Sequence, residues 1–274
     1  MRVGLFGYPV AHSASPRMHN AAFAALGLAD WRYELWETAP EDLGRRVAAL
    51  RTDPGIAGAN VTIPHKQAVV AHLDGVSAHA VSIGAVNTLF RDGGRLLGEN
   101  TDWIGFLDDL RRHGLGNLAG ARALVLGAGG SARAICYALV RAGADTRVVN
   151  RDPARAESLA ASLPGVRALP ALDQAQALGT DLIVNCTSAG MEPRETTTPW
   201  PSDLPFPAQA AVYDLVYKPA TTRLMRDAFS AGLRVIGGIG MLAEQGAEAF
   251  SLWTGRDARE ASVIMRQTLG VPPV

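Results

Sequence analysis

Few cysteines, few aromatic residues and no excess of either charge characterise this sequence of 274 residues. Its two cysteines, Cys136 and Cys186, have no CxxC spacing, so we expect buried thiols rather than a disulfide framework or a zinc site, and a cytoplasmic location. Because 26 basic residues balance 26 acidic ones, the chain lacks the general positive field that favours nucleic acid or anionic lipid. We therefore expect no nucleic acid and no membrane among its partners.

Long apolar runs are also missing. The first residues contain one arginine and a short apolar run interrupted by Pro9 and His12, unlike a secretory signal, and no run approaches the ~20 residues of a membrane-spanning helix. With 48% hydrophobic and 19% charged residues, the chain is expected to be a soluble globular protein, long enough for two domains. No coiled-coil heptads are recognisable, which leaves monomer and homodimer as alternatives.

Short apolar strands alternate with amphipathic helices along the first part of the chain, which predicts an α/β domain with a largely parallel sheet. A turn at Asp92-Gly93-Gly94 then predicts a hairpin between strands 85–90 and 95–98 and the end of the first domain near residue 100. The expected strands before the hairpin are 2–6, 31–37 and 56–61, and the expected helices are 16–26 and 40–50.

A second alternation starts at strand 122–126 and continues through a glycine-rich turn, a helix over 131–142 and a strand over 146–150. This order is typical of one half of a dinucleotide-binding domain. Further strands are expected at 182–186, 211–215 and 234–236, a loop at 193–207, and closing helices at 242–253 and 258–269. We expect the domains to be 1–101 and 102–240, followed by a C-terminal helical segment, 241–274.

The glycine-rich turn fits the pattern G-x-G-x-x-A through Gly127, Gly129 and Ala132. In such a turn the first glycine permits the tight bend, the second lets backbone amides approach a pyrophosphate, and the alanine allows close helix packing. The alternative is an ordinary glycine-rich loop between a strand and a helix. The strand, helix and second strand around it favour a dinucleotide site.

The end of the second strand decides which dinucleotide is expected. An NAD site usually has an acidic residue there, whereas this chain has Asn150, with Arg151 and Arg155 close behind. Guanidinium groups suit a 2′-phosphate and favour NADP, although a solvated helix start is the alternative explanation for the arginines. Asp152 adds a negative charge nearby, and its position before Pro153 predicts a helix N-cap.

Polar residues also cluster at strand ends and turns of the first domain, a pattern typical of a site for a small polyol. A lysine beside an aspartate can exchange a proton with an alcohol or a carbonyl. Each residue also has a simpler explanation: helix capping for Ser15 and Asp102, turn hydrogen bonds for Asn60 and Asn87, and a surface position for Lys66. The segments are SAS at 13–15, NVTIPHK at 60–66, GAVNT at 84–88 and NTD at 100–102.

Taken together, these segments resemble the shikimate dehydrogenase family, and the similarity runs nearly from end to end. The ordered set of motifs is specific. Beyond those already quoted, it consists of IGAVNT at 83–88, ENTD at 99–102, GAGGSARA at 127–134, NRDPAR at 150–155, NCTSAGM at 185–191, YDLVYKP at 213–219 and GIGMLAEQGAEAF at 238–250.

The resemblance implies a substrate domain, a Rossmann-like NADP domain and C-terminal helices that return to the substrate domain. It also implies the reversible NADP-dependent reduction of 3-dehydroshikimate to shikimate, in the biosynthesis of chorismate and aromatic amino acids, with no metal. Lys66 and Asp102 would form the catalytic pair. The substrate would contact Ser13 and Ser15 through its carboxylate, with Tyr217 adding a hydrogen bond, and Thr62, Asn87 and Gln245 through its ring hydroxyls.

The cofactor residues implied by the resemblance fall into three groups. The pyrophosphate group is Gly127, Ala128, Gly129, Gly130, Ser131 and Ala132; the ribose-phosphate group is Asn150, Arg151 and Arg155; and the nicotinamide group is Thr187, Leu215, Gly238 and Met241. Simple packing is the alternative for Tyr217 and Met241. Asp152 stands where the family often has Thr or Ser, so an NAD-using quinate/shikimate dehydrogenase is one alternative. A non-catalytic NADP-binding sensor is another, and the presence of both Lys66 and Asp102 argues against it.

Overall fold

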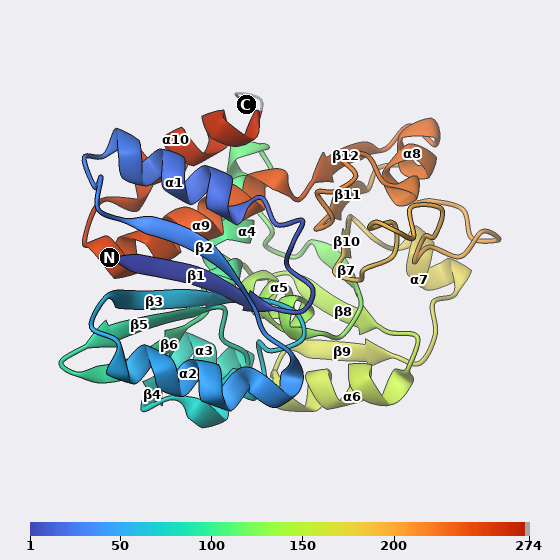
Figure 1. Cartoon of the computed structure of the whole chain (residues 1–274). Helices are drawn as coiled ribbons and strands as arrows, with labels where there is room; N and C mark the ends of the chain where they lie inside the picture. Colours follow the sequence, from blue (N-terminus) through green and yellow to red (C-terminus); the bar gives the residue numbers. More distant parts are fainter. Residues whose placement is uncertain (272–274) are drawn as a thin grey trace. The chain divides into compact units, whose positions relative to one another are not determined.

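The computed structural model describes residues 1–271 (Figure 1). It divides into two compact units, one formed by Met1–Asp109 with the segment from Leu242 onward and the other by Leu110–Met241. Each unit has its own six-stranded sheet with helical cover, so the predicted two-domain α/β class is confirmed. Among the described residues, no helix combines the length and apolar character that crossing a membrane requires.

The sheet of the first unit has the strand order β2-β1-β3-β5-β6-β4. β1, β2 and β3 are parallel, and β5 and β6 form the predicted antiparallel hairpin, in which Asp92 pairs with Arg95. Gly93 and Gly94 have φ values of +54° and +82° at its tip, which glycine adopts without strain. The strands are β1 Arg2–Gly7, β2 Arg32–Glu37, β3 Ile56–Val61, β4 Gly75–Val76, β5 Thr88–Asp92 and β6 Arg95–Glu99.

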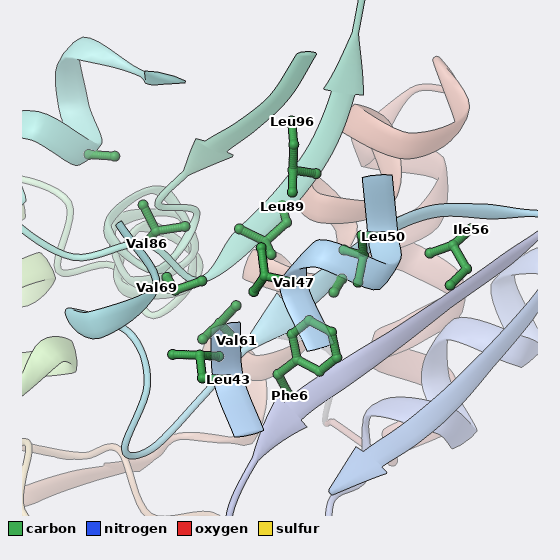
Figure 2. Packing of buried hydrophobic residues seen from close by; sticks show 12 residues of the cluster. Phe6, Leu43, Val47, Leu50, Ile56, Val61, Val69, Val86, Leu89 and Leu96 are labelled. Atoms are coloured by element: carbon green, nitrogen blue, oxygen red, sulfur yellow. The ribbon is translucent and has the colours of Figure 1, made fainter. Parts of the chain in front are cut away.

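Helix α2 (Leu43–Thr52) covers one face of this sheet. Leu43, Val47 and Leu50 are spaced so that they share one helix face, and all three are buried against the sheet. Figure 2 shows them packed around Phe6 and Leu89 of the strands. The predicted helix over 40–50 therefore exists, although its first turn is a separate 3₁₀ turn, Pro40–Asp42.

Helices α1 (Ser15–Ala25), α9 (Ile239–Thr254) and α10 (Ala258–Leu269) lie on the other side of the sheet (Figure 1). α1 packs along α10 and on β2. An aromatic contact joins α1 to α9, because the rings of Phe23 and Phe250 stack with centroids 5.0 Å apart. The remaining helical segments of this unit are the 3₁₀ turn Ala68–His72, α3 Ala78–Ile83 and the start of α4 Asp102–Arg112.

The second unit has a fully parallel sheet with the order β12-β11-β10-β7-β8-β9. Numbered from β7, this is the doubly wound order 3-2-1-4-5-6, in which ligands bind where the order reverses, between β7 and β10. Its strands are β7 Arg122–Leu126, β8 Asp145–Val149, β9 Val166–Leu169, β10 Leu182–Asn185, β11 Ala211–Asp214 and β12 Arg234–Gly237. Its helices are α5 Gly130–Arg141, α6 Pro153–Ser162, α7 Gln174–Leu178 and α8 Arg223–Ser230.

Candidate active site

The first unit brings Lys66 and Asp102 into direct contact. Lys66 follows the end of β3, and Asp102 is the first residue of α4. The lysine Nζ donates to Asp102 Oδ2 over 2.6 Å, and the two side chains are only 11% and 6% exposed. Lys66 is therefore not a surface lysine, and the Asp102 carboxylate forms an ion pair with it. Such a pair holds an ammonium group in a fixed orientation away from bulk water.

The carboxamide of Asn87 contacts the second carboxylate oxygen of Asp102 in this ion pair. Its Oδ1 accepts a hydrogen bond of 2.8 Å from the backbone N–H of Thr101, which fixes the orientation of the amide. The Nδ2 group consequently faces Asp102 Oδ1 at 2.9 Å and Gln245 Oε1 at 3.3 Å. Both oxygens of Asp102 are thus engaged. Predicted site residues from distant parts of the sequence meet at one place in the first unit.

Two buried residues extend this cluster beyond the residues that the sequence singled out for roles. Asn60 donates through its Nδ2 to the Asn87 carbonyl and to Thr88 Oγ1, and its Oδ1 accepts from the Tyr33 hydroxyl at 2.9 Å. Thr88 in turn donates to Asn87 Oδ1. The sequence signal for these residues is their place at strand ends beside the predicted site, but only the fold shows the bonds.

The two serines of the SAS segment lie together at the start of α1. Ser13 Oγ and Ser15 Oγ are 3.1 Å apart, and Ser13 Oγ also accepts from the Ser15 backbone N–H. The capping explanation for Ser15 is wrong, because Ala14 is the N-cap and no side chain caps this helix. Thr62 follows β3, with its methyl 2.4 Å from the position of a Cβ on Gly7, so only a glycine fits opposite it.

In the second unit, the glycine-rich turn follows β7 and opens α5. Gly127 has a φ of +108°, which favours glycine, while a Cβ on Gly129 would meet nothing within 4 Å. Gly129 is the N-cap of α5 and offers no side chain to its first amides. Ala132 is fully buried. The turn has the open, amide-lined form that a pyrophosphate requires, so the residues present fit a dinucleotide.

Asn150, Arg151 and Arg155 follow β8, the strand next to the turn. Both arginines are exposed. The N-cap prediction for Asp152 is confirmed, since its carboxylate accepts from the Ala154 backbone N–H and Asn150 donates to its carbonyl. Part of the negative charge of Asp152 is therefore directed at the amides of α6, which leaves the guanidinium groups available for a phosphate.

The predicted nicotinamide residues follow the carboxyl ends of β10, β11 and β12. Thr187 follows β10, and its Cγ2 is 3.0 Å from the position of a Cβ on Gly127. Leu215 follows β11, and a Cβ on Gly238 would lie 2.3 Å from the Leu215 carbonyl oxygen. Met241 is buried and Tyr217 is half-buried, both in the second unit. The roles of these residues stay predictions.

The two cysteines differ in their burial. Burial raises the pKa of the Cys136 thiol to about 12, so this thiol stays protonated. Cys136 is buried as predicted, whereas Cys186 is only half-buried. Across residues 1–271, no group of three or more His, Cys, Asp or Glu side chains is arranged to hold a metal ion.

Family models match three segments of the chain. Residues 5–89 match the shikimate dehydrogenase substrate binding domain, residues 109–193 match shikimate / quinate 5-dehydrogenase, and residues 238–269 match the shikimate 5′-dehydrogenase C-terminal domain. The shikimate dehydrogenase (NADP(+)) of Symbiobacterium thermophilum is 47% identical over 93% of this chain and 89% of its own length.

Solved structures agree with the family models. Shikimate 5-dehydrogenase from Thermus thermophilus, solved with NADP(H) and shikimate, has a TM-score of 0.87 and 45% identity, covering 98% of this chain and 99% of its own. The enzyme of Listeria monocytogenes, solved with shikimate and NAD, has a TM-score of 0.84 and 33% identity, covering 96% of each chain. With its motifs, its two sheets and these relatives in agreement, the chain belongs to the shikimate dehydrogenase family.

Proposed function

We propose that this chain is an NADP-dependent shikimate dehydrogenase, which interconverts 3-dehydroshikimate and shikimate in chorismate and aromatic amino-acid biosynthesis. The observation that carries the proposal is the buried Lys66–Asp102 ion pair, whose carboxylate accepts a hydrogen bond from Asn87. The pair occurs in a chain that belongs to this family. We assign substrate binding to the first unit and NADP binding to the second. The location stays the cytoplasm predicted from the cysteines, and monomer and homodimer stay alternatives.

Lys66 is the general acid in the direction of reduction. Its ammonium donates a proton to the oxygen that becomes the C3 hydroxyl, and it takes the proton back in the direction of oxidation. Asp102 fixes the direction of the lysine ammonium group through its hydrogen bond, while Asn87 fixes the carboxylate. Bound NADPH supplies the hydride. The chain itself supplies the proton and the placement of the reacting oxygen.

Hydroxyl and amide groups bind the substrate in this proposal, and all of them except that of Tyr217 belong to the first unit. Ser13 and Ser15 bind its carboxylate, since two adjacent hydroxyls can both donate to it. Thr62, Asn87 and Gln245 bind its ring hydroxyls, and Tyr217 adds a phenolic hydrogen bond to the carboxylate.

The cofactor residues divide by the part of NADP that each one binds. The turn from Gly127 to Ala132 takes the pyrophosphate on backbone amides, and the groups around Thr187, Leu215, Gly238 and Met241 take the nicotinamide end. Asn150, Arg151 and Arg155 take the ribose 2′-phosphate, for which guanidinium groups supply paired donors.

An initial-rate assay with shikimate or quinate and with NADP⁺ or NAD⁺ tests this function. Turnover mainly with shikimate and NADP⁺ is the expected result. Comparable rates with NAD⁺ or quinate would assign the chain to the quinate/shikimate class. This class is the second candidate, because the carboxylate of Asp152 lies beside Arg151 and because the Listeria relative was solved with NAD. Nucleotide binding without turnover in any combination would indicate the sensor and refute the proposal.

Replacing Lys66 by alanine separates chemistry from binding. The variant is expected to lose roughly 100-fold or more in kcat, the range of general acid–base catalysis. Its dissociation constant for NADP⁺ should stay at the wild-type value, because Lys66 belongs to the first unit. This constant is the control for correct folding of the second unit. A kcat near that of the wild type would remove Lys66 from the mechanism.

A further inference from the structure

A buried carboxylate that the proposed mechanism does not use lies at the end of β11. Asp214 is fully buried and accepts three hydrogen bonds, from Asn185 Nδ2 at 2.8 Å, from the Val216 backbone N–H at 3.0 Å and from Thr222 Oγ1 at 2.6 Å. All three partners are donors, so the site is built for an ionised acceptor. Burial raises the pKa of Asp214, whereas these same bonds oppose the rise.

Asn185 links Asp214 to the predicted cofactor site through further hydrogen bonds. Asn185 ends β10, and its Oδ1 accepts from the Thr187 backbone N–H at 2.9 Å and from Thr187 Oγ1 at 2.7 Å. Because a backbone N–H can only donate, it fixes the amide orientation and leaves Nδ2 for Asp214. The chain of bonds therefore runs from Asp214 through Asn185 to Thr187.

Thr187 lies where the strand order reverses, with its methyl against the first glycine of the dinucleotide turn. Its hydroxyl proton is committed to Asn185, and its oxygen already accepts one bond of 3.1 Å from the Ala189 backbone N–H. One lone pair remains, so the hydroxyl can offer a bound molecule only an acceptor.

We propose that Asp214 is a positioning residue for cofactor binding, an inference that rests on the proposed NADP-dependent function. Asp214 acts through Asn185, which holds Thr187 as a hydrogen-bond acceptor for a donor group of the nicotinamide half. The same carboxylate holds the Val216 amide, next to Leu215, and the N-cap of α8, Thr222. It therefore joins the two loops that carry predicted nicotinamide residues, and those loops follow adjacent parallel strands.

Three variants and a control test the proposal through the dissociation constant for NADP⁺, measured by calorimetry. Asp214→Ala removes both carboxylate oxygens and should raise the dissociation constant for NADP⁺ about 10-fold, as expected for lost hydrogen bonds to a charged group. Asp214→Asn keeps an oxygen for Asn185 and Val216, folds more securely, and should raise it only about 3-fold. Val212→Ala, a buried core change on the same strand, should leave the constant within about 2-fold while lowering the melting temperature.

Thr187→Val completes a double-mutant cycle. If Asp214 acts through Thr187, this variant should raise the constant about 10-fold, and adding it to Asp214→Ala should raise it little further, because both changes disable one chain of bonds. Additive effects, or an Asp214→Ala variant that binds NADP⁺ like the wild type, would overturn the inference alone. A wild-type protein that binds no NADP⁺ would instead overturn the proposed function, and this inference with it.

Discussion

Acid should destabilise this protein through one histidine. His19 of α1 is fully buried, its ring stacks on Tyr33 with centroids 4.3 Å apart, and Trp253 packs at 5.4 Å. Within residues 1–271, neither ring nitrogen has a hydrogen-bond partner. Loss of solvation therefore lowers the pKa of His19 from 6.5 to about 3 in the folded state.

The sign of the effect follows from proton counting. Between about pH 6.5 and pH 3 the unfolded chain binds a proton at His19 and the folded chain does not, so the free energy of unfolding falls as the pH falls. At pH 8 both states are neutral at this position. At pH 5, which is about 1.5 units below the unfolded pKa, the linkage amounts to about 2 kcal/mol of lost stability.

Urea unfolding of the wild type and of His19→Phe at pH 8, 6.5 and 5 measures this loss. The phenyl ring keeps the stack on Tyr33 and cannot take a proton, so the variant should lose about 2 kcal/mol less than the wild type between pH 8 and pH 5. His12→Gln, a change at an exposed histidine, is the control and should follow the wild type. Equal losses in the wild type and His19→Phe would refute the assignment of this acid sensitivity to His19.

Three further predictions concern other residues. Gly127→Ala should raise KM for NADP⁺ about 10-fold, since the new methyl meets Thr187 at 3.0 Å and the φ of +108° is unfavourable for alanine; initial rates at varied NADP⁺ check this. Arg151→Ala should raise KM for NADP⁺ about 10-fold and leave KM for NAD⁺ nearly unchanged, which the same assay measures. Arg266→Met should cost about 3–5 kcal/mol of stability, because it removes a buried cation that pairs with both Asp109 and Glu244; urea unfolding checks this, with exposed Arg259→Met as the control.

The sequence predicted the fold best where the periodicity was strong. Strands β3 and β7 and helix α10 have the predicted bounds, because apolar runs, glycines and capping residues mark both of their ends. Strand β9 (Val166–Leu169) was not predicted, since its four residues have too short a pattern to distinguish it from a loop. Helix α8 was also not predicted, although the capping residue Thr222 precedes it in the sequence.

The candidate site shows the same division between local and distant information. Lys66 and Asp102 could be paired from their motifs, but the direction of the Asn87 amide depends on the backbone of Thr101, which the hairpin brings near. Asp214 lay inside a recognised motif without a role, because its partners Asn185 and Thr222 come from a neighbouring strand and a following helix. Hydrogen-bond direction is a property of the folded chain and cannot be read from residue types.

The two central aspartates are arranged alike but have different partners, and this difference separates their roles. In each unit an asparagine is oriented by a backbone N–H at its Oδ1 and presents its Nδ2 to a buried carboxylate, Asn87 to Asp102 and Asn185 to Asp214. Asp102 uses its second oxygen for an ammonium group that can give up a proton, so its charge is coupled to the chemistry. Asp214 uses its second oxygen for the Thr222 hydroxyl, a neutral donor that does not ionise at ordinary pH, so it can only hold its neighbours in place. Changes at Asp102 should therefore alter the pH dependence of kcat, whereas changes at Asp214 should alter cofactor affinity and leave that pH dependence as it is in the wild type.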